Sequence, residues 1–306
     1  MIKRVIEISS GPTRLSVANR QLVIEREDRR RATLPCEDIG VLVVDNNAVS
    51  YTHSVFTTLI DAGAAIVLCG GDHHPAGLVM PLAGNTVQTE RHRGQIEAAQ
   101  PLLKRLWQIV VSGKLQQQSF VLSSVAGTDE GLRELAGRVR SGDPDNLEAQ
   151  GAQRYWPKLM GTEFRRSRAG PPPNNLLNYG YMVLRAGMAR AVCAAGLIPT
   201  LGLHHRNRYN PFCLADDLME PYRPFVDLRV AAIVRDGFGA IDIDRPMKQR
   251  ILSIFGDTLT IAGQRSPLML ALHSTAASLV SSLESGRPGL ALPEGLPVPV
   301  PSNERS

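Results

Sequence analysis

The most informative stretch of the sequence is residues 202–224, which read GLHHRNRYNPFCLADDLMEPYRP. In this stretch a histidine pair precedes three carboxylates: His204 and His205, then Asp216, Asp217 and Glu220. Residues three or four positions apart share one face of a helix, so we expect the three acids to lie together. Because clustered carboxylates repel one another, a cation or basic side chains must sit among them. Oxygen donors with one imidazole suit Mg²⁺ or Mn²⁺, and this pattern indicates a hard divalent metal.

A purely structural role for these residues is an open alternative. Asp216 could be exposed on the surface, and Asp217 could pair with Arg206, Arg208 or Arg223. Adjacent histidines are also common in polar loops. Taken from the residues alone, the structural and the functional interpretations carry about equal weight.

Glu148 lies in the first turn of a helix predicted for residues 146–160. The positive end of the helix dipole favours an acid at this place in any helix, so Glu148 alone indicates little. Its small neighbours Ala149, Gly151 and Ala152 would let another helix approach closely.

Composition sets broad limits on the fold and the compartment. The 306 residues are 43% hydrophobic, enough for one large domain or two ordinary ones, and the net charge is only +5. The four cysteines lack CxxC spacing, which argues against a zinc site and, without a secretory segment, against disulfides. No apolar run reaches membrane-spanning length, and we expect no membrane partner and a reducing cytoplasmic location.

The distribution of apolar residues predicts an α+β protein in which a small β-rich N-terminal domain precedes a larger all-helical catalytic domain. The first domain covers residues 1–84, where an apolar strand at 39–44, a helix at 50–62 and a strand at 64–69 form a crossover unit. Helical spacing dominates residues 85–288. Residues 289–306 are rich in proline and are expected to be a disordered tail.

Two motifs carry a resemblance to a known family. The block at 202–224 and the segment EAQGAQRYW at 148–156 resemble the integrase subunit of CRISPR spacer acquisition, in its type II branch. The resemblance extends over the chain up to the tail. It implies metal ligands at the catalytic residues Glu148, His205 and Glu220, with Asp217 as an auxiliary acid in the second shell. His204 is a neighbour whose role the resemblance does not define.

The resemblance also implies an activity and a set of partners. A metal-dependent DNA integrase and endonuclease would use Mg²⁺ or Mn²⁺ while a 3′-hydroxyl of spacer DNA attacks the repeat phosphodiester in the array. Homodimers would form through the N-terminal domain. With a small dimeric CRISPR-associated partner they would form a heterohexamer on double-stranded DNA, which the RNA-guided effector nuclease and an accessory adaptation protein could join.

Basic residues in several predicted loops and helices are candidate phosphate contacts. The DNA-binding candidates are Arg91, Arg93, Arg165, Arg166, Arg168, Lys248 and Arg250. A solvated basic surface explains each of them equally well. Two other functions remain open: a non-catalytic DNA-binding scaffold, and a metal-dependent hydrolase acting on a small substrate.

Overall fold

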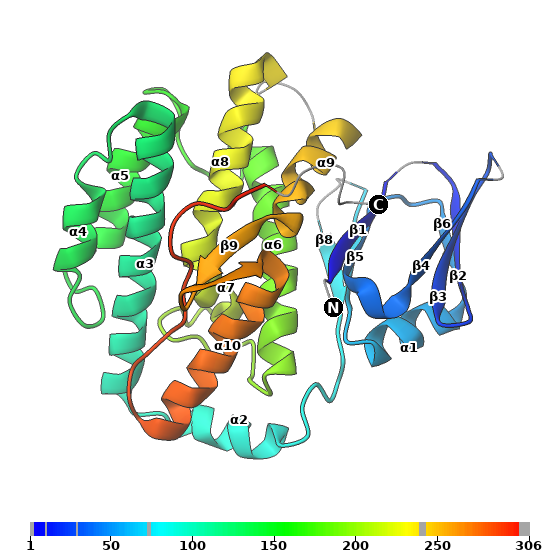
Figure 1. The fold of residues 1–306 in the computed structure, drawn as a ribbon, viewed down its shortest axis with the longest axis horizontal. Coiled ribbons are helices and arrows are strands. Elements are labelled where there is room, and N and C mark those ends of the chain that lie inside the picture. The colour runs from blue at the N-terminus through cyan, green and yellow to red at the C-terminus, as the bar shows by residue number, and fades with distance from the viewer. Residues whose placement is uncertain (1–2, 10, 29, 72–74, 239–242, 300–306) are drawn as a thin grey trace.

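A computed structural model describes residues 3–9, 11–28, 30–71, 75–238 and 243–299 of the chain. Strands from the N-terminal part of the chain gather at one end of the molecule, and most of the helices lie at the other (Figure 1). The α+β class predicted from the sequence is confirmed.

The first sheet has the strand order β4-β3-β2-β6. Its members are β2 (Thr13–Ala18), β3 (Gln21–Arg26), β4 (Arg31–Pro35) and β6 (Val49–Tyr51). β2 and β3 meet at the pair Ala18 and Gln21, so their hairpin has a two-residue loop. Both loop residues have positive φ, 51° at Asn19 and 59° at Arg20, as a type I′ turn requires. Such a turn matches the twist of the strands and fixes their register.

The second sheet has the order β1-β5-β7-β8. It consists of β1 (Arg4–Ile8), β5 (Ile39–Val44), β7 (Ala65–Cys69) and β8 (Pro75–Val79). The first three strands are parallel, and β8 is antiparallel to β7. Helix α1 (His53–Asp61) connects β6 to β7, which confirms the predicted strand, helix and strand succession over residues 39–69.

Strand β5 divides two hydrophobic cores. Val41 and Val43 belong to the core of the helical part, whereas Leu42 and Val44 belong to the core of the β-rich part. Successive side chains of a strand point to opposite faces, so one apolar run serves both cores. All six residues of β5 are buried, as is typical of a parallel strand covered on both faces.

Helices make up most of the chain after β8. They are α2 (Gln88–Ile96), α3 (Gln100–Ala126), α4 (Leu132–Arg138), α5 (Leu147–Met160), α6 (Asn174–Ala194), α7 (Cys213–Met219), α8 (Arg223–Ile233), α9 (Arg245–Leu252) and α10 (Leu268–Ser285). Shorter helical turns are η1 (Cys36–Asp38), η2 (Glu220–Tyr222), η3 (Val234–Phe238) and η4 (Ser253–Gly256). Among the described residues, no helix is both long enough and apolar enough to cross a membrane.

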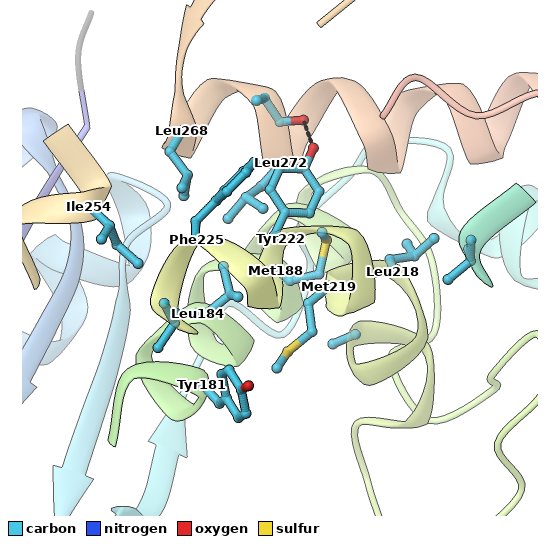
Figure 2. Packing of buried hydrophobic residues seen from close by; sticks show 14 of the residues in the cluster. Tyr181, Leu184, Met188, Leu218, Met219, Tyr222, Phe225, Ile254, Leu268 and Leu272 are labelled. Atoms are coloured by element: carbon cyan, nitrogen blue, oxygen red, sulfur yellow. Dashed lines mark hydrogen bonds between the residues drawn. The ribbon is translucent and has the colours of Figure 1, made fainter. Parts of the chain in front are cut away.

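The junction of η2 and α8 is anchored in the helical core. Figure 2 shows Tyr222 and Phe225 pointing toward Leu272 on α10. Both aromatic side chains are almost fully buried, and the hydroxyls of Tyr222 and Thr275 share a hydrogen bond of 2.6 Å. Burying two large aromatic groups is worth several kcal/mol, on the order of 2–3 kcal/mol for each. Glu220, two residues before Tyr222, is therefore attached to a rigid part of the fold.

The expected all-helical composition of residues 85–288 is wrong. β9 (Thr258–Ile261) and β10 (Gln264–Pro267) form an antiparallel hairpin within this region. Leu259 and Ile261 are buried while Thr258 and Thr260 are less so, which is strand alternation over four residues. A segment this short gives a weak periodic signal beside the long helix α10 that follows it.

The expected disorder of residues 289–306 is also wrong for the part that the structure describes. We call residues 289–299 the C-terminal strap. The Pro293 carbonyl accepts a hydrogen bond of 2.5 Å from Gln117, and the Ala291 carbonyl accepts one of 2.6 Å from Thr275. Val298 pairs with Thr258 of β9. A proline-rich segment cannot form a core of its own, but it can lie extended over a core that already exists. Residues 300–306 lie outside the described part.

Candidate active site

The loop after α6 brings both histidines against Asp217 of α7. Oδ2 of Asp217 accepts the backbone N–H groups of His204 at 2.9 Å and of His205 at 3.4 Å. Oδ1 is hydrogen-bonded to Nδ1 of His205. A Cβ atom on Gly202 would lie 2.8 Å from Oδ2 and 2.5 Å from the His205 carbonyl, so the loop can close only around a glycine. Of the ring nitrogens of His205, Nε2 is left to face a ligand.

The charge of Asp217 also affects His205. The hydrogen bond to the Asp217 carboxylate raises the pKa of His205, and burial of the ring opposes the change without cancelling it. The carboxylate itself is completely buried, whereas the His205 side chain remains 46% exposed. Asp217 therefore holds the imidazole from the protein side and leaves its other side open.

Trp107 of α3 forms the wall behind the two imidazoles. Its ring stacks on His204 with centroids 4.5 Å apart and an angle of 5° between planes. His205 meets the same indole edge-on, with centroids 5.5 Å apart. His204 thus has a packing role that the sequence did not reveal, since its ring fixes the loop against α3.

Glu220 is a buried carboxylate with two cationic neighbours. Oε1 lies 3.1 Å from the Arg223 guanidinium, and Oε2 lies 2.6 Å from Nζ of Lys114 on α3. Burial alone would raise the pKa of Glu220, but Arg223 and Lys114 outweigh it and the pKa is lowered. Glu220 is consequently ionised at neutral pH.

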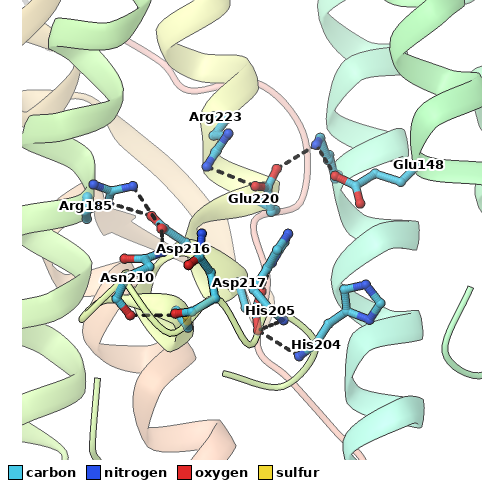
Figure 3. A network of polar contacts seen from close by, with 12 residues as sticks. Glu148, Arg185, His204, His205, Asn210, Asp216, Asp217, Glu220 and Arg223 are labelled. Carbon is cyan, nitrogen blue, oxygen red and sulfur yellow. Dashed lines mark hydrogen bonds and ion pairs between the residues drawn. The ribbon is translucent and has the colours of Figure 1, made fainter. Parts of the chain in front are cut away.

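Glu148 faces the same cation from α5. Lys114 Nζ donates a hydrogen bond of 2.6 Å to Oε1 of Glu148. Figure 3 shows the side chains of Glu148 and Glu220 pointing toward each other. Asp143 accepts the backbone N–H groups of Leu147 at 2.9 Å and of Glu148 at 3.1 Å, which fixes the start of α5.

A small residue allows α5 to approach α3 at this level. A Cβ atom on Gly151 would lie 2.2 Å from Leu115 Cδ2, so a larger residue would force the Leu115 side chain or the helix to shift. The small neighbours of Glu148 therefore do allow the close approach that the sequence predicted. Lys114 and Leu115 are adjacent on α3, and this approach is what brings Glu148 within reach of Lys114.

Sequence reasoning missed Lys114 altogether. A lysine on a long helix is ordinarily solvated, and its two partners lie 34 and 106 residues away in the chain. Burial lowers the pKa of Lys114, but Glu220 and Glu148 overcome that effect and raise the pKa above its ordinary value. One local signal exists: Trp107 and Lys114 are seven positions apart and share a face of α3.

The donor set suits a hard divalent ion, although Lys114 now lies between the carboxylates. Among the described residues, no three His, Cys, Asp or Glu side chains are arranged to hold a metal as they stand. Oε2 of Glu220 is nevertheless buried without an aligned hydrogen-bond donor, because the short contact with Lys114 lacks hydrogen-bond geometry. Nδ1 of His205 bonds to a carboxylate, as is usual in metal-binding histidines. Glu148, Glu220 and Nε2 of His205 are thus chemically fit to hold Mg²⁺ or Mn²⁺.

Asp216 has a structural role rather than a position on the surface. It is 7% exposed and receives two hydrogen bonds from Arg185, at 2.6 and 2.9 Å. Asn210 donates a third at 2.7 Å. This forked ion pair holds α7 against α6, and its strength comes from the matched planar geometry of the two groups.

An arginine-lined cavity opens next to Glu220. Its volume is about 460 Å³, and its walls include Arg166, Arg168, Arg185 and Arg223. Asn178 and Tyr181 complete the polar part of the lining. Two of these guanidinium groups are paired with acids, Arg185 with Asp216 and Arg223 with Glu220, and Arg166 and Arg168 add positive charge that is suited to phosphate oxygens.

The other candidate DNA contacts fare differently. Lys248 is contradicted, because it is 4% exposed and forms an ion pair with the buried Asp45. Arg165 donates to the Thr162 and Phe164 carbonyls of its own loop. Arg93 is exposed, whereas Arg91 is half-buried and donates to the Ala195 carbonyl at 2.9 Å, and Arg250 is half-buried and pairs with Asp236. DNA contacts by these three residues remain predictions.

Comparison with known proteins first places the fold. The structure is similar to a solved structure titled "Casposase bound to integration product", with a TM-score of 0.77, 16% identity and coverage of 94% of this chain and 92% of that one. A second is titled "Cas6-RT-Cas1--Cas2 complex", with a TM-score of 0.72, 17% identity and coverage of 94% and 35%. At these identities the likeness establishes the fold alone.

The sequence establishes the family. Residues 6–241 match the model of the family described as CRISPR associated protein Cas1. A curated relative, "CRISPR-associated endonuclease Cas1" of Neisseria meningitidis serogroup C, strain 8013, is 35% identical over 302 residues, 97% of this chain and 98% of the relative. The chain belongs to the Cas1 family of CRISPR-associated endonucleases, as its motifs at 148–156 and 202–224 indicated.

Proposed function

We propose that this protein is a metal-dependent DNA integrase and endonuclease that inserts spacer DNA into a CRISPR array. One observation carries the proposal: Glu148 and Glu220 both contact the same cation, the Lys114 ammonium. His205, held by Asp217, supplies a nitrogen donor in the same group of residues. Membership of the Cas1 family supports this activity, as does a structural neighbour whose title names an integration product.

Each residue of the proposed site has a distinct task. Glu148, Glu220 and His205 Nε2 would hold Mg²⁺ or Mn²⁺, which when bound supplies positive charge for the pentacovalent phosphorus and lowers the pKa of a bound hydroxyl. Asp217 holds His205 with Nε2 directed away from it. Arg223 compensates Glu220 so that the carboxylate stays ionised in its buried position.

The arginine-lined cavity is the proposed phosphate-binding region. Arg223 belongs both to this cavity and to the Glu220 ion pair, so a phosphate held there would lie beside the proposed metal position. Arg166 and Arg168 come from the loop before α6 and extend the positive charge away from the site. Attack by a 3′-hydroxyl exchanges one phosphodiester for another, so the reaction needs no external energy source.

The proposed partners follow from the family. We expect a homodimer formed through the β-rich part and a heterohexamer with a small dimeric partner, acting on double-stranded DNA in the cytoplasm. A structural neighbour is titled as a complex that contains Cas1 and Cas2, which supports a partner of this kind.

Strand transfer tests the proposal directly. A short duplex with free 3′-hydroxyls would be incubated with a plasmid that carries leader and repeat, with and without the small partner, in Mg²⁺, Mn²⁺ or EDTA. Glu220→Gln and His205→Ala should abolish joining, whereas Glu134→Gln, in an exposed ion pair on α4, should not. DNA binding without joining in any condition would support a scaffold, and neither binding nor joining would support a small-molecule hydrolase.

A further inference from the structure

Lys114 lies where the proposed metal would have to bind. Its ammonium is 2.6 Å from Glu148 Oε1 and 2.6 Å from Glu220 Oε2, and only 13% of its side chain is exposed. Mg²⁺ binds carboxylate oxygens at about 2.0–2.1 Å, so an ion shared by these two oxygens would fall within van der Waals distance of the ammonium. The two cations cannot occupy this position together.

The second cation on Glu220 is placed differently. Arg223 contacts the other oxygen, Oε1, and its guanidinium also lies over the Tyr181 ring, 4.9 Å from the centroid. Within the described part of the chain, Arg223 pairs with Glu220 and forms no ion pair with Glu148. Among the described residues, Lys114 is the cation that joins both acids, and it does so through the oxygens that face each other.

The backbone of Lys114 is held in place by its surroundings. A Cβ atom on the preceding Gly113 would lie 2.6 Å from Leu292 of the C-terminal strap. On the same face of α3, Trp107 is fixed by its stack on His204. Because α3 is packed on both of these sides, we expect the ammonium to leave the carboxylates by rotation of its flexible side chain.

We propose that Lys114 is a built-in competitor of the divalent ion, an inference that rests on the metal-dependent function proposed above. In the metal-free protein its ammonium offsets part of the negative charge of Glu148 and Glu220 and holds α3, α5 and η2 together. Binding of the ion requires the ammonium to leave both oxygens. Lys114 therefore weakens metal affinity and stabilises the empty site.

Metal affinity is the direct test. Mn²⁺ binding would be measured by isothermal titration calorimetry on EDTA-treated full-length wild type, Lys114→Met and Lys114→Arg. Lys114→Met should bind Mn²⁺ roughly tenfold more tightly or better, which corresponds to about 1.4 kcal/mol for an ion pair that no longer has to break. Lys114→Arg keeps the positive charge and should stay within about threefold of wild type.

Lys158→Met serves as a matched control, and thermal unfolding serves as a second measurement. Lys158→Met removes a lysine that is paired with Glu130 at 3.1 Å on the surface, and it should bind Mn²⁺ as wild type does. In thermal unfolding, Lys114→Met should melt lower than wild type in EDTA and gain more from saturating Mn²⁺. If Lys114→Met does not fold, Lys114→Gln, which keeps a hydrogen-bonding group without the charge, takes its place.

Each outcome decides the matter. Equal or weaker Mn²⁺ affinity in the uncharged variants would overturn the competitor role while leaving a metal-binding wild type intact. Absence of Mn²⁺ binding in wild type and in Lys114→Met alike would overturn both this inference and the metal-dependent function. Tighter binding that Glu148→Gln removes from the Lys114→Met background would support it.

Discussion

Replacing Asp217 with asparagine should leave the fold largely intact and disable His205. The two side chains have almost the same shape, but the amide offers one acceptor oxygen where the carboxylate offers two. Two backbone N–H groups, those of His204 and His205, already bond to Oδ2. If the amide oxygen serves these groups, the amide N–H₂ must face Nδ1 of His205.

The loss of stability and of metal affinity follows from replacing the carboxylate with an amide. The variant loses one charge-assisted hydrogen bond in a completely buried position, a cost of about 1.5–3 kcal/mol in the free energy of unfolding. An amide that donates to Nδ1 favours the tautomer with hydrogen on Nε2, which removes the lone pair proposed to hold the metal. Loss of such an orienting carboxylate typically lowers metal affinity or activity by about 10–100-fold.

The assay pairs urea denaturation with strand transfer and Mn²⁺ titration for wild type, Asp217→Asn and Asp216→Asn. Asp216 lies beside Asp217 on α7, and its replacement breaks the ion pair with Arg185 of α6 without touching His205. Asp216→Asn should therefore lose stability yet keep Mn²⁺ affinity. A folded Asp217→Asn protein with wild-type metal affinity and wild-type strand transfer would refute the reasoning.

Three further predictions concern charge elsewhere in the structure. Burial raises the pKa of Asp227 to about 7 from an ordinary value of 3.8, so its contribution to stability is complete below pH 4 and is lost as pH rises toward 7. Urea denaturation from pH 5 to 7 should show the advantage of wild type over Asp227→Asn falling by roughly 1 kcal/mol per pH unit, and a constant difference would contradict this. Lys248→Met breaks the buried ion pair with Asp45 and should destabilise the fold by about 3–5 kcal/mol with unchanged DNA affinity, measured by denaturation and fluorescence anisotropy. Arg166→Gln with Arg168→Gln should weaken DNA binding for all sequences and flatten its salt dependence, and an unchanged salt slope would remove the cavity from the DNA path.

Long apolar runs and helical spacing predicted most of the fold correctly. The run at residues 39–44 is buried on both faces, and no polar residue interrupts its strand signal. The β9–β10 hairpin was missed because four residues hold too little periodicity beside a long helix. The C-terminal strap was missed because its order depends on surfaces such as Gln117 and Thr275, which composition cannot show.

The candidate site divides in the same way. His205, Asp217 and Glu220 lie within 16 positions of one another, so their association was open to local reasoning. Lys114 and Lys248 were misjudged because burial of a lysine depends on which distant carboxylate faces it after folding. Apart from the spacing of Lys114 from Trp107 on α3, the local sequence does not distinguish these two residues from solvated lysines.

The position of β5 between two cores has a consequence for cooperativity. Its alternate side chains supply both cores, so the β-rich part cannot unfold without exposing Val41 and Val43, which belong to the helical part. Cutting the chain near residue 84 would leave an exposed apolar surface on each fragment. A shift of one residue along β5 would exchange the two sets of side chains, so an insertion there would disturb both halves at once. A subunit contact through the β-rich part would therefore be connected, through the packing of β5, to the helical core that supports Glu148 and Glu220.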